Sequence, residues 1–214
     1  MKNYVSASIL GADITHLADE CKRLEENNVD MLHFDVMDGC FVNNISFGLP
    51  VLCALNKCTD MFMDVHLMIN DPLKYIGEFV KAGSDMITFH LESQSDPKAT
   101  ISEIKKAGIK AGISIKPATP VEEVYKYLDI VDMVLIMTVE PGFGGQGFIH
   151  ETLEKVEKLK KYITEKNIDI DIQVDGGIND KTAKLVRTAG ANNLVSGSYL
   201  FSADSMADAV KSLK

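Results

Sequence analysis

The chain alternates short β-rich runs with amphipathic segments from one end of its 214 residues to the other. Alternation at this spacing is typical of βαβ units, in which parallel strands pair and helices cover them. Eight strand-like runs favour closure into a barrel over an open doubly wound sheet. The runs are Val5–Leu10, Met31–Met37, Phe62–Met68, Met86–His90, Lys110–Ile115, Met133–Met137, Asp171–Asp175 and Asn193–Ser196.

Helical patterns separate these runs, and no Ser/Gly/Pro-rich linker interrupts them. Glycine follows several of these patterns, at Gly83, Gly108 and Gly190, where a left-handed residue commonly ends a helix. We therefore expect residues 1–214 to form a single α/β domain, a (β/α)8 TIM barrel with short helices and loops. The predicted helices are Ile14–Asn28, Pro72–Ala82, Pro97–Ala107, Val121–Leu128, Glu151–Asn167 and Asp180–Ala189.

The formal net charge of −9 narrows the range of partners. A nucleic-acid scaffold needs a basic face, and an anionic membrane surface attracts basic proteins, so we expect neither partner. A small phosphorylated substrate is compatible with this charge, because backbone amides bind phosphate locally. The four cysteines form no C-x-x-C pair, the N-terminus has no signal-like apolar run, and no stretch approaches the ~18 apolar residues of a membrane span. We expect a cytoplasmic protein.

The second strand carries polar residues on the face that points into the barrel. Side chains alternate along a strand, so His33, Asp35 and Met37 share one face, and Phe34 and Val36 share the other. The Phe/Val face suits packing against helices. Burying His and Asp is costly unless something satisfies them. One explanation is a His–Asp hydrogen bond that only stabilises the strand, and the other is a functional site.

Two further strands repeat this pattern. The third strand places Asp64, His66 and Met68 on one face, and the seventh ends in Asp175, which shares a face with Gln173. Neighbouring strands lie about 4.8 Å apart, so inward side chains of adjacent strands can reach one shared ion. Mixed nitrogen and oxygen ligands suit one divalent metal ion, Zn²⁺, Fe²⁺, Mn²⁺ or Co²⁺, and the sequence does not choose among them. The predicted ligands are His33, Asp35, His66 and Asp175.

Glycine-rich segments follow the sixth, seventh and eighth strands. Glycines let the backbone approach a ligand and expose its N–H groups, and phosphate sites in such barrels commonly use the loops after strands seven and eight. One such pair is more often a turn than a site, but loops on successive strands meet at one rim. The segments are residues 142–147, Gly176-Gly177 and Gly197-Ser198.

Six motifs occur in order along nearly the whole chain: SILGAD at 8–13, HFDVMDG at 33–39, DVHLM at 64–68, MTVEPGFGGQ at 137–146, VDGG at 174–177 and SGS at 196–198. Together they resemble the ribulose-phosphate 3-epimerase family, and the resemblance implies a barrel of the ribulose-phosphate-binding type. The resemblance implies an isomerase of carbohydrate metabolism, in the pentose phosphate pathway, that interconverts D-ribulose 5-phosphate and D-xylulose 5-phosphate. The implied reaction is metal-assisted proton transfer at C3 through a 2,3-enediolate.

The resemblance also implies roles for individual residues. Asp35 and Asp175 would be the acid/base pair, one on each face of the sugar, while also holding the metal with His33 and His66. A homo-oligomer is expected as well. The implied substrate- and phosphate-binding residues are Ser8, His66, Gly142, Phe143, Gly144, Gly145, Gly176, Gly177, Gly197 and Ser198.

The chain departs from the family's usual pattern near the predicted pocket, at Cys40, Asn43 and Tyr199. These departures leave open a hexulose-phosphate 3-epimerase, for example one acting on allulose 6-phosphate. A related lyase of the decarboxylase and hexulose-phosphate synthase kind is the alternative from another class. Lyases of that kind carry an Asp-x-Lys motif on the third strand, whereas this chain has Asp64-Val65-His66 there. The third alternative is a barrel that binds a sugar phosphate without catalysis.

Overall fold

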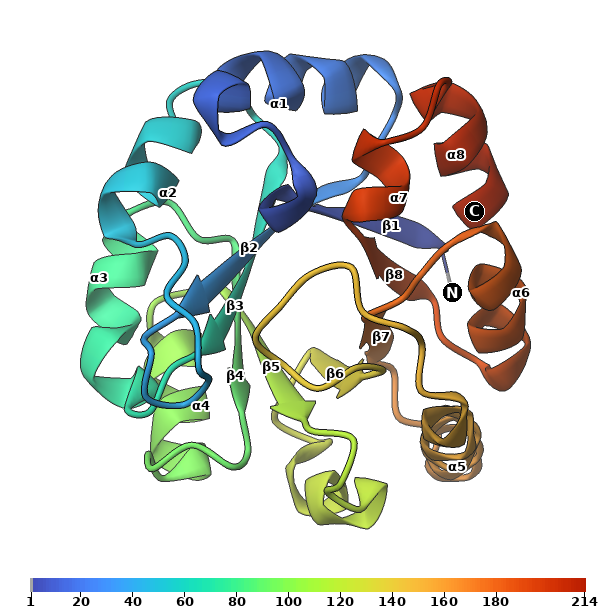
Figure 1. The fold of residues 1–214 in the computed structure, drawn as a ribbon. Coiled ribbons are helices and arrows are strands. Elements are labelled where there is room, and N and C mark those ends of the chain that lie inside the picture. Colours follow the sequence, from blue (N-terminus) through green and yellow to red (C-terminus); the bar gives the residue numbers. More distant parts are fainter. Residues whose placement is uncertain (1) are drawn as a thin grey trace.

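The strands pair in chain order and close on themselves, since β1 pairs with both β2 and β8, and all pairs are parallel (Figure 1). This computed structural model describes residues 2–214. It confirms the predicted eight-stranded barrel. The strands are β1 (Tyr4–Ser8), β2 (Met31–Met37), β3 (Phe62–Met68), β4 (Met86–His90), β5 (Lys110–Ile115), β6 (Met133–Met137), β7 (Asp171–Asp175) and β8 (Asn193–Ser196).

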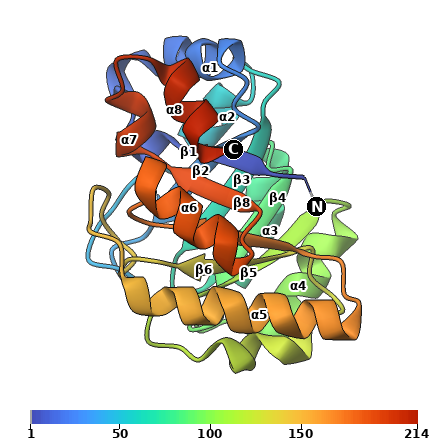
Figure 2. The same cartoon turned by 90° about the vertical axis from the view of Figure 1, so that its right-hand side faces the viewer.

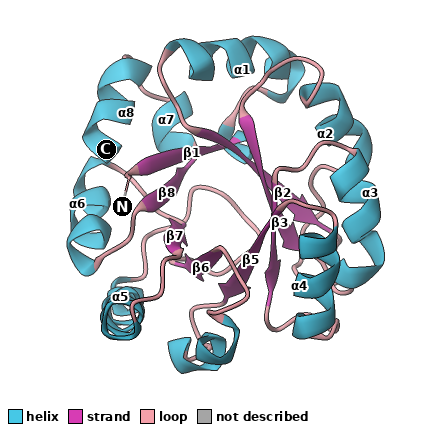
Figure 3. Cartoon of the chain, turned by 180° about the vertical axis from the view of Figure 1, so that it is seen from behind, coloured by secondary structure: helices cyan, strands magenta, loops and turns pink. Residues whose placement is uncertain are grey.

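Helices surround the barrel and follow the strands around its outside, as the view from behind shows most clearly (Figure 3). The α-helices are α1 (Leu17–Glu26), α2 (Leu49–Leu55), α3 (Ile76–Lys81), α4 (Pro97–Lys106), α5 (Leu153–Lys166), α6 (Asp180–Ala189), α7 (Ser198–Phe201) and α8 (Met206–Leu213). Short 3₁₀ helices are η1 (Ile9–Gly11), η2 (Ile14–His16), η3 (Pro72–Tyr75), η4 (Val121–Tyr127) and η5 (His150–Thr152).

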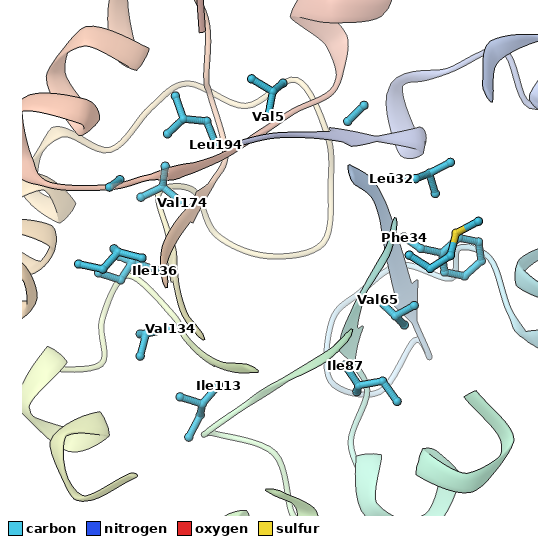
Figure 4. Close-up of a cluster of buried hydrophobic side chains, with 14 of the residues drawn as sticks. Val5, Leu32, Phe34, Val65, Ile87, Ile113, Val134, Ile136, Val174 and Leu194 are labelled. Atoms are coloured by element: carbon cyan, nitrogen blue, oxygen red, sulfur yellow. The ribbon is translucent and has the colours of Figure 1, made fainter. Parts of the chain in front are cut away.

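The main apolar core lies between the barrel and the helices. Outward-facing strand residues such as Phe34, Val65 and Ile113 are fully buried, and Figure 4 shows them on the helix side of their strands. Each fully buried side chain of this size contributes about 1.5–3 kcal/mol relative to an exposed one. The outer faces of the strands therefore hold the barrel together, and the inner faces are left to carry polar groups.

Several helix boundaries differ from the predicted ones. The segment 121–127 is a 3₁₀ helix throughout, and the predicted helices at 14–28, 72–82 and 151–167 each begin with a 3₁₀ turn. The first strand ends at Ser8, because residues 9–11 turn into η1. The predicted glycine ends are confirmed, since Gly83, Gly108 and Gly190 all have positive φ.

The two ends of the chain meet at the side of the barrel (Figure 2). Asn3 Nδ2 donates to the Lys214 carbonyl at 2.9 Å, and Arg187 on α6 donates to the carbonyls of both Tyr4 and Leu213. Within residues 2–214, no helix combines the length and apolar character that crossing a membrane requires.

Candidate active site and metal centre

Four side chains from three strands converge inside the barrel. His33 and Asp35 come from β2, His66 from β3 and Asp175 from the end of β7, and one ligand atom from each lies within 4.8 Å of every other. The parallel register sets this convergence, because Asp35 pairs with His66 across β2 and β3. The predicted ligand set is therefore brought to one point.

A cation at this point fits the atoms that surround it. The Nε2 atom of His33 is buried without a hydrogen-bond partner, 3.3 Å from Asp35 Oδ1 and 3.8 Å from Asp175 Oδ2. The Nδ1 atom of His66 lies 3.1 Å and 3.9 Å from the same two oxygens. Two imidazole nitrogens and two carboxylate oxygens form a donor set that suits Zn²⁺ and similar divalent ions.

His33 is oriented from below by a buried carboxylate. Its Nδ1 atom lies 2.8 Å from Asp64 Oδ2, and Ser6 Oγ and Gln173 Nε2 donate to the same oxygen at 2.9 and 2.6 Å. The Asp64–His33 contact leaves His33 Nε2 directed at the four-residue group, the set formed by His33, Asp35, His66 and Asp175. Such a carboxylate behind a histidine ligand fixes the ring and its tautomer.

His66 has a different support. Its Nε2 atom lies 2.9 Å from Nε2 of His90, and His90 Nδ1 lies 3.2 Å from Glu92 Oε2. Burial lowers the pKa of His90 to about 4. Burial raises the pKa of Glu92, but hydrogen bonds from His90 and Thr119 outweigh it and bring the value to about 2. The pair is thus a neutral imidazole beside an ionised carboxylate.

The two aspartates of the site have opposite acidities. Burial raises the pKa of Asp175 to about 6, and the nearby charge of Asp35 adds to the rise. Burial also raises the pKa of Asp35, but the interactions with His33 and His66 outweigh it. The pKa of Asp35 therefore lies well below its usual range. For His33, burial lowers the pKa while Asp35 and Asp64 raise it, with a large net rise. These shifts describe the protein without metal.

A cavity of about 440 Å³ opens above the four-residue group. The predicted glycine-rich segments meet on one side of it, and the loop after β6 arches across the barrel mouth in Figure 1. Met37, Met68 and Met137 from the strand ends supply apolar wall. The predicted residues that line the cavity are Ser8, Asp35, Gly142, Phe143, Gly144, Gly145, Asp175, Gly176, Gly177, Gly197 and Ser198.

Two of the residues predicted to bind substrate, His66 and Ser8, are placed differently with respect to the cavity. His66 is fully buried beneath the cavity and does not line it. Ser8 lines the cavity, and its hydroxyl donates to Asp35 Oδ2 at 2.7 Å. His16 and His150 are exposed, and His150 also lies at the cavity edge.

Sequence reasoning missed the residues that support the site from behind. Ser6 and Gln173 hold Asp64, and His90 and Glu92 hold His66. The alternation along β4 carried a usable signal, because it places His90 on the inward face with Thr88, and both are fully buried. A further missed contact joins two rim loops, since Asn44 Nδ2 donates to the Gly142 carbonyl at 2.7 Å.

Comparisons with solved structures agree with the fold. The chain aligns over its whole length with 3-hexulose-6-phosphate synthase from Salmonella typhimurium (TM-score 0.70, 17% identity, 96% of that chain). It also aligns with 3-keto-L-gulonate-6-phosphate decarboxylase from Vibrio cholerae (TM-score 0.73, 14% identity, 100% of this chain and 96% of that one). At these identities the likeness concerns the barrel fold alone.

Sequence comparisons are far more specific. Residues 4–201 match the profile of the ribulose-phosphate 3 epimerase family. The ribulose-phosphate 3-epimerase of Bacillus subtilis is 44% identical over 211 residues, 98% of this chain and 97% of that protein. The chloroplastic ribulose-5-phosphate-3-epimerase of Arabidopsis thaliana is 45% identical over 98% of this chain and 75% of that protein. The chain belongs to the ribulose-phosphate 3-epimerase family.

Proposed function

We propose that this enzyme interconverts D-ribulose 5-phosphate and D-xylulose 5-phosphate by removing and returning the proton at C3. The observation that carries the proposal is the pair of aspartates, Asp35 and Asp175, beside two histidines at the floor of one cavity. Relatives that carry the epimerase name, at 44% and 45% identity over nearly the whole chain, support the same reaction.

The acid/base work falls to Asp35 and Asp175. Both line the cavity, so a substrate bound there is open to two carboxyl groups from different strands. One carboxylate takes the C3 proton, and the other carboxyl returns a proton to the opposite face of the carbon; the reverse reaction exchanges their roles. The reaction needs one carboxyl group ionised while the other holds a proton.

The same four side chains would hold one divalent metal ion. Its ligands would be His33, Asp35, His66 and Asp175, whose facing lone pairs fit a cation. When bound, the ion supplies positive charge that stabilises negative charge developing on the substrate's oxygens. Zn²⁺, Fe²⁺, Mn²⁺ and Co²⁺ all suit this donor set.

Phosphate binding would use backbone groups rather than side-chain cations. Among the described residues that line the cavity there is no Lys or Arg. The rim instead carries the glycines of three loops together with the Ser198 hydroxyl, and Gly142, Gly145, Gly176 and Gly177 have positive φ. Loops of this kind direct N–H groups at anions. An anchor away from C3 contributes positioning energy to the reaction.

The alternative functions differ from the proposed one in the substrate or in the reaction. A hexulose-phosphate epimerase would use the same aspartates with room for one more carbon. A lyase of the decarboxylase kind would need a lysine ammonium on the third strand, where this chain has His66, fully buried between Asp35 and His90. A barrel that only binds the sugar phosphate would have no use for two carboxyl groups facing one carbon.

The test compares two substrates and one isosteric variant. We expect metal-loaded enzyme to convert ribulose 5-phosphate with a higher kcat/KM than allulose 6-phosphate, and Asp175→Asn to lose about 10²–10⁴-fold in kcat. A higher kcat/KM for the hexulose would assign the sister activity. Release of formaldehyde or CO₂ would assign the lyase. Near-normal turnover of Asp175→Asn with metal bound would remove Asp175 from the acid/base pair.

A further inference from the structure

A line of polar side chains runs from the candidate metal centre to the outer loops. His66 Nε2 contacts His90 Nε2 at 2.9 Å, and His90 Nδ1 contacts Glu92 Oε2 at 3.2 Å. The other carboxylate oxygen of Glu92 accepts from the Lys116 amide at 2.8 Å and from the Thr119 hydroxyl. His90 is fully buried, whereas the Glu92 side chain is 22% exposed.

This line fixes where each proton sits. A carboxylate only accepts, so Glu92 requires an N–H at His90 Nδ1, which leaves His90 Nε2 as an acceptor. In a neutral ring, His66 Nε2 then donates to it and His66 Nδ1 keeps its lone pair. That lone pair faces Asp35 Oδ1 at 3.1 Å and Asp175 Oδ2 at 3.9 Å. A cation placed among these three atoms would contact all of them at once.

The surroundings hold the line in place. The Phe41 ring lies 4.8 Å from the His90 ring, and Lys116 Nζ lies 3.9 Å from the centre of the Phe41 ring. The loop that binds Glu92 is itself fastened, because Lys155 Nζ donates to the carbonyls of residues 116, 117 and 119 at 3.0, 2.5 and 2.5 Å. Rotation of His90 or withdrawal of Glu92 would break several of these contacts.

We propose that His90 and Glu92 are positioning residues that hold His66 in the tautomer whose Nδ1 lone pair points at the metal site. The inference rests on the proposed metal-dependent function. It assigns a purpose to a buried histidine that touches neither the cavity nor the four-residue group's oxygens. Outer partners of this kind commonly change metal affinity 10–100-fold when they are replaced.

The variant Glu92→Gln separates this role from simple packing. The amide oxygen keeps the two donors from residues 116 and 119, so the amide N–H group faces His90 Nδ1. His90 must then carry its proton on Nε2, and His66 is driven to carry its own on Nδ1. We expect the Kd for Zn²⁺, measured by competition with a chromophoric chelator, to rise about 10–100-fold. Glu122→Gln, an exposed carboxylate on η4, is the matched control and leaves the Kd unchanged.

Two further measurements distinguish positioning from loss of fold. ¹⁵N-histidine NMR of the metal-free proteins reports the tautomer directly: we expect the His66 proton on Nε2 in the wild type and on Nδ1 in Glu92→Gln. His90→Gln keeps an acceptor for His66 and retains more Zn²⁺ affinity than His90→Leu, which offers none. A role in packing alone would lower the urea midpoint and leave the His66 tautomer unchanged.

The outcomes that overturn the proposal are distinct from those that overturn the metal site. If Glu92→Gln binds Zn²⁺ with a Kd within about threefold of the wild type, well short of the 10–100-fold effect, the positioning role is wrong and the metal site stands. A metal-free wild-type His66 that carries its only ring proton on Nδ1 would likewise remove the positioning role and leave the metal site standing. A wild type that binds no metal at the four-residue group overturns the metal site itself, and the positioning role with it.

Discussion

Asp35 and Asp175 are the same chemical group in one cavity, yet their neighbours give them opposite acidities. Histidines on two sides keep Asp35 ionised, whereas burial and the charge of Asp35 raise the pKa of Asp175 to about 6 from an ordinary 3.8. A carboxyl with a raised pKa disfavours the fold once it ionises. The metal-free protein is therefore strained by Asp175 above about pH 6, and a bound cation relieves that strain.

This strain predicts a stabilising substitution in the catalytic centre. In protein treated with chelator, Asp175→Asn removes the unfavourable charge, so we expect the free energy of unfolding near pH 8 to rise by about 3 kcal/mol. The gain shrinks as the pH falls through about 6 towards 4, because wild-type Asp175 is then neutral in the folded state. Urea unfolding at several pH values measures both. A variant that is less stable than the wild type at the higher pH would contradict the assigned acidity.

The chemistry of the site depends on loops that pack closely against one another. Gly177, after β7, has φ +67°, and a Cβ there would lie 2.6 Å from the backbone nitrogen of Phe148, in the segment after β6. Gly147, one residue before Phe148, has open space where a Cβ would be and no positive φ. Gly177 therefore has no room for a larger side chain, whereas Gly147 on the same rim does.

We expect Gly177→Ala to lower the free energy of unfolding by about 1–3 kcal/mol through overpacking and left-handed strain, and to raise KM for the sugar phosphate. Gly147→Ala is the matched control and stays within about 0.5 kcal/mol of the wild type. Thermal unfolding and steady-state kinetics measure the two effects. Equal behaviour of the two variants would mean that the rim loops are free to separate.

At the level of elements, the sequence predicted the strands better than the helices. Seven strands, β2 to β8, have the predicted bounds, because their short β-rich runs stand out from the amphipathic segments between them. The helix η4 was predicted without its 3₁₀ character, although its buried residues Val121, Val124 and Tyr127 recur every three positions, the period of a 3₁₀ helix. The helices α2, α7 and α8 were not among the predicted ones, and α2 has Pro50 in its first turn, where proline is tolerated.

The candidate site, too, could be predicted from the sequence only in part. The four proposed metal ligands could be predicted because each lies on the inner face of a strand or at its end, which period-two alternation reveals. Their supports could not, because contacts such as Gln173–Asp64 and His66–His90 join residues that only the closed barrel brings together. Compartment and oligomeric state stay predictions, since the geometry of one chain bears on neither.

At the scale of the whole molecule, one arginine away from the active site links the two ends of the chain. The Arg187 guanidinium on α6 donates to the Tyr4 carbonyl at the start of β1 and to the Leu213 carbonyl at the end of α8, both at 2.9 Å. The active-site groups lie at the opposite ends of the strands, where Ser8 ends β1. The first strand, the last helix and α6 are thus tied together at a distance from the chemistry.

Arg187→Met should leave these carbonyls unpaired in a half-buried position. We expect the free energy of unfolding to fall by about 2–4 kcal/mol, while kcat stays at the wild-type value because the cavity is untouched. Arg23→Met, which removes a surface arginine paired only with Glu20 on α1, is the control and changes stability by less than about 1 kcal/mol. A fall in kcat for Arg187→Met at constant stability would show that the two ends of the barrel are coupled.

Proton transfer at C3 by Asp35 and Asp175 is the core of the proposed reaction, and solvent exchange at that carbon reports it most directly. Metal-loaded enzyme is incubated with ribulose 5-phosphate in D₂O and followed by NMR. We expect deuterium at C3 together with the appearance of xylulose 5-phosphate, and loss of both in Asp175→Asn. Tight binding of the sugar phosphate with no deuterium at C3, despite bound metal, would contradict the proposed reaction.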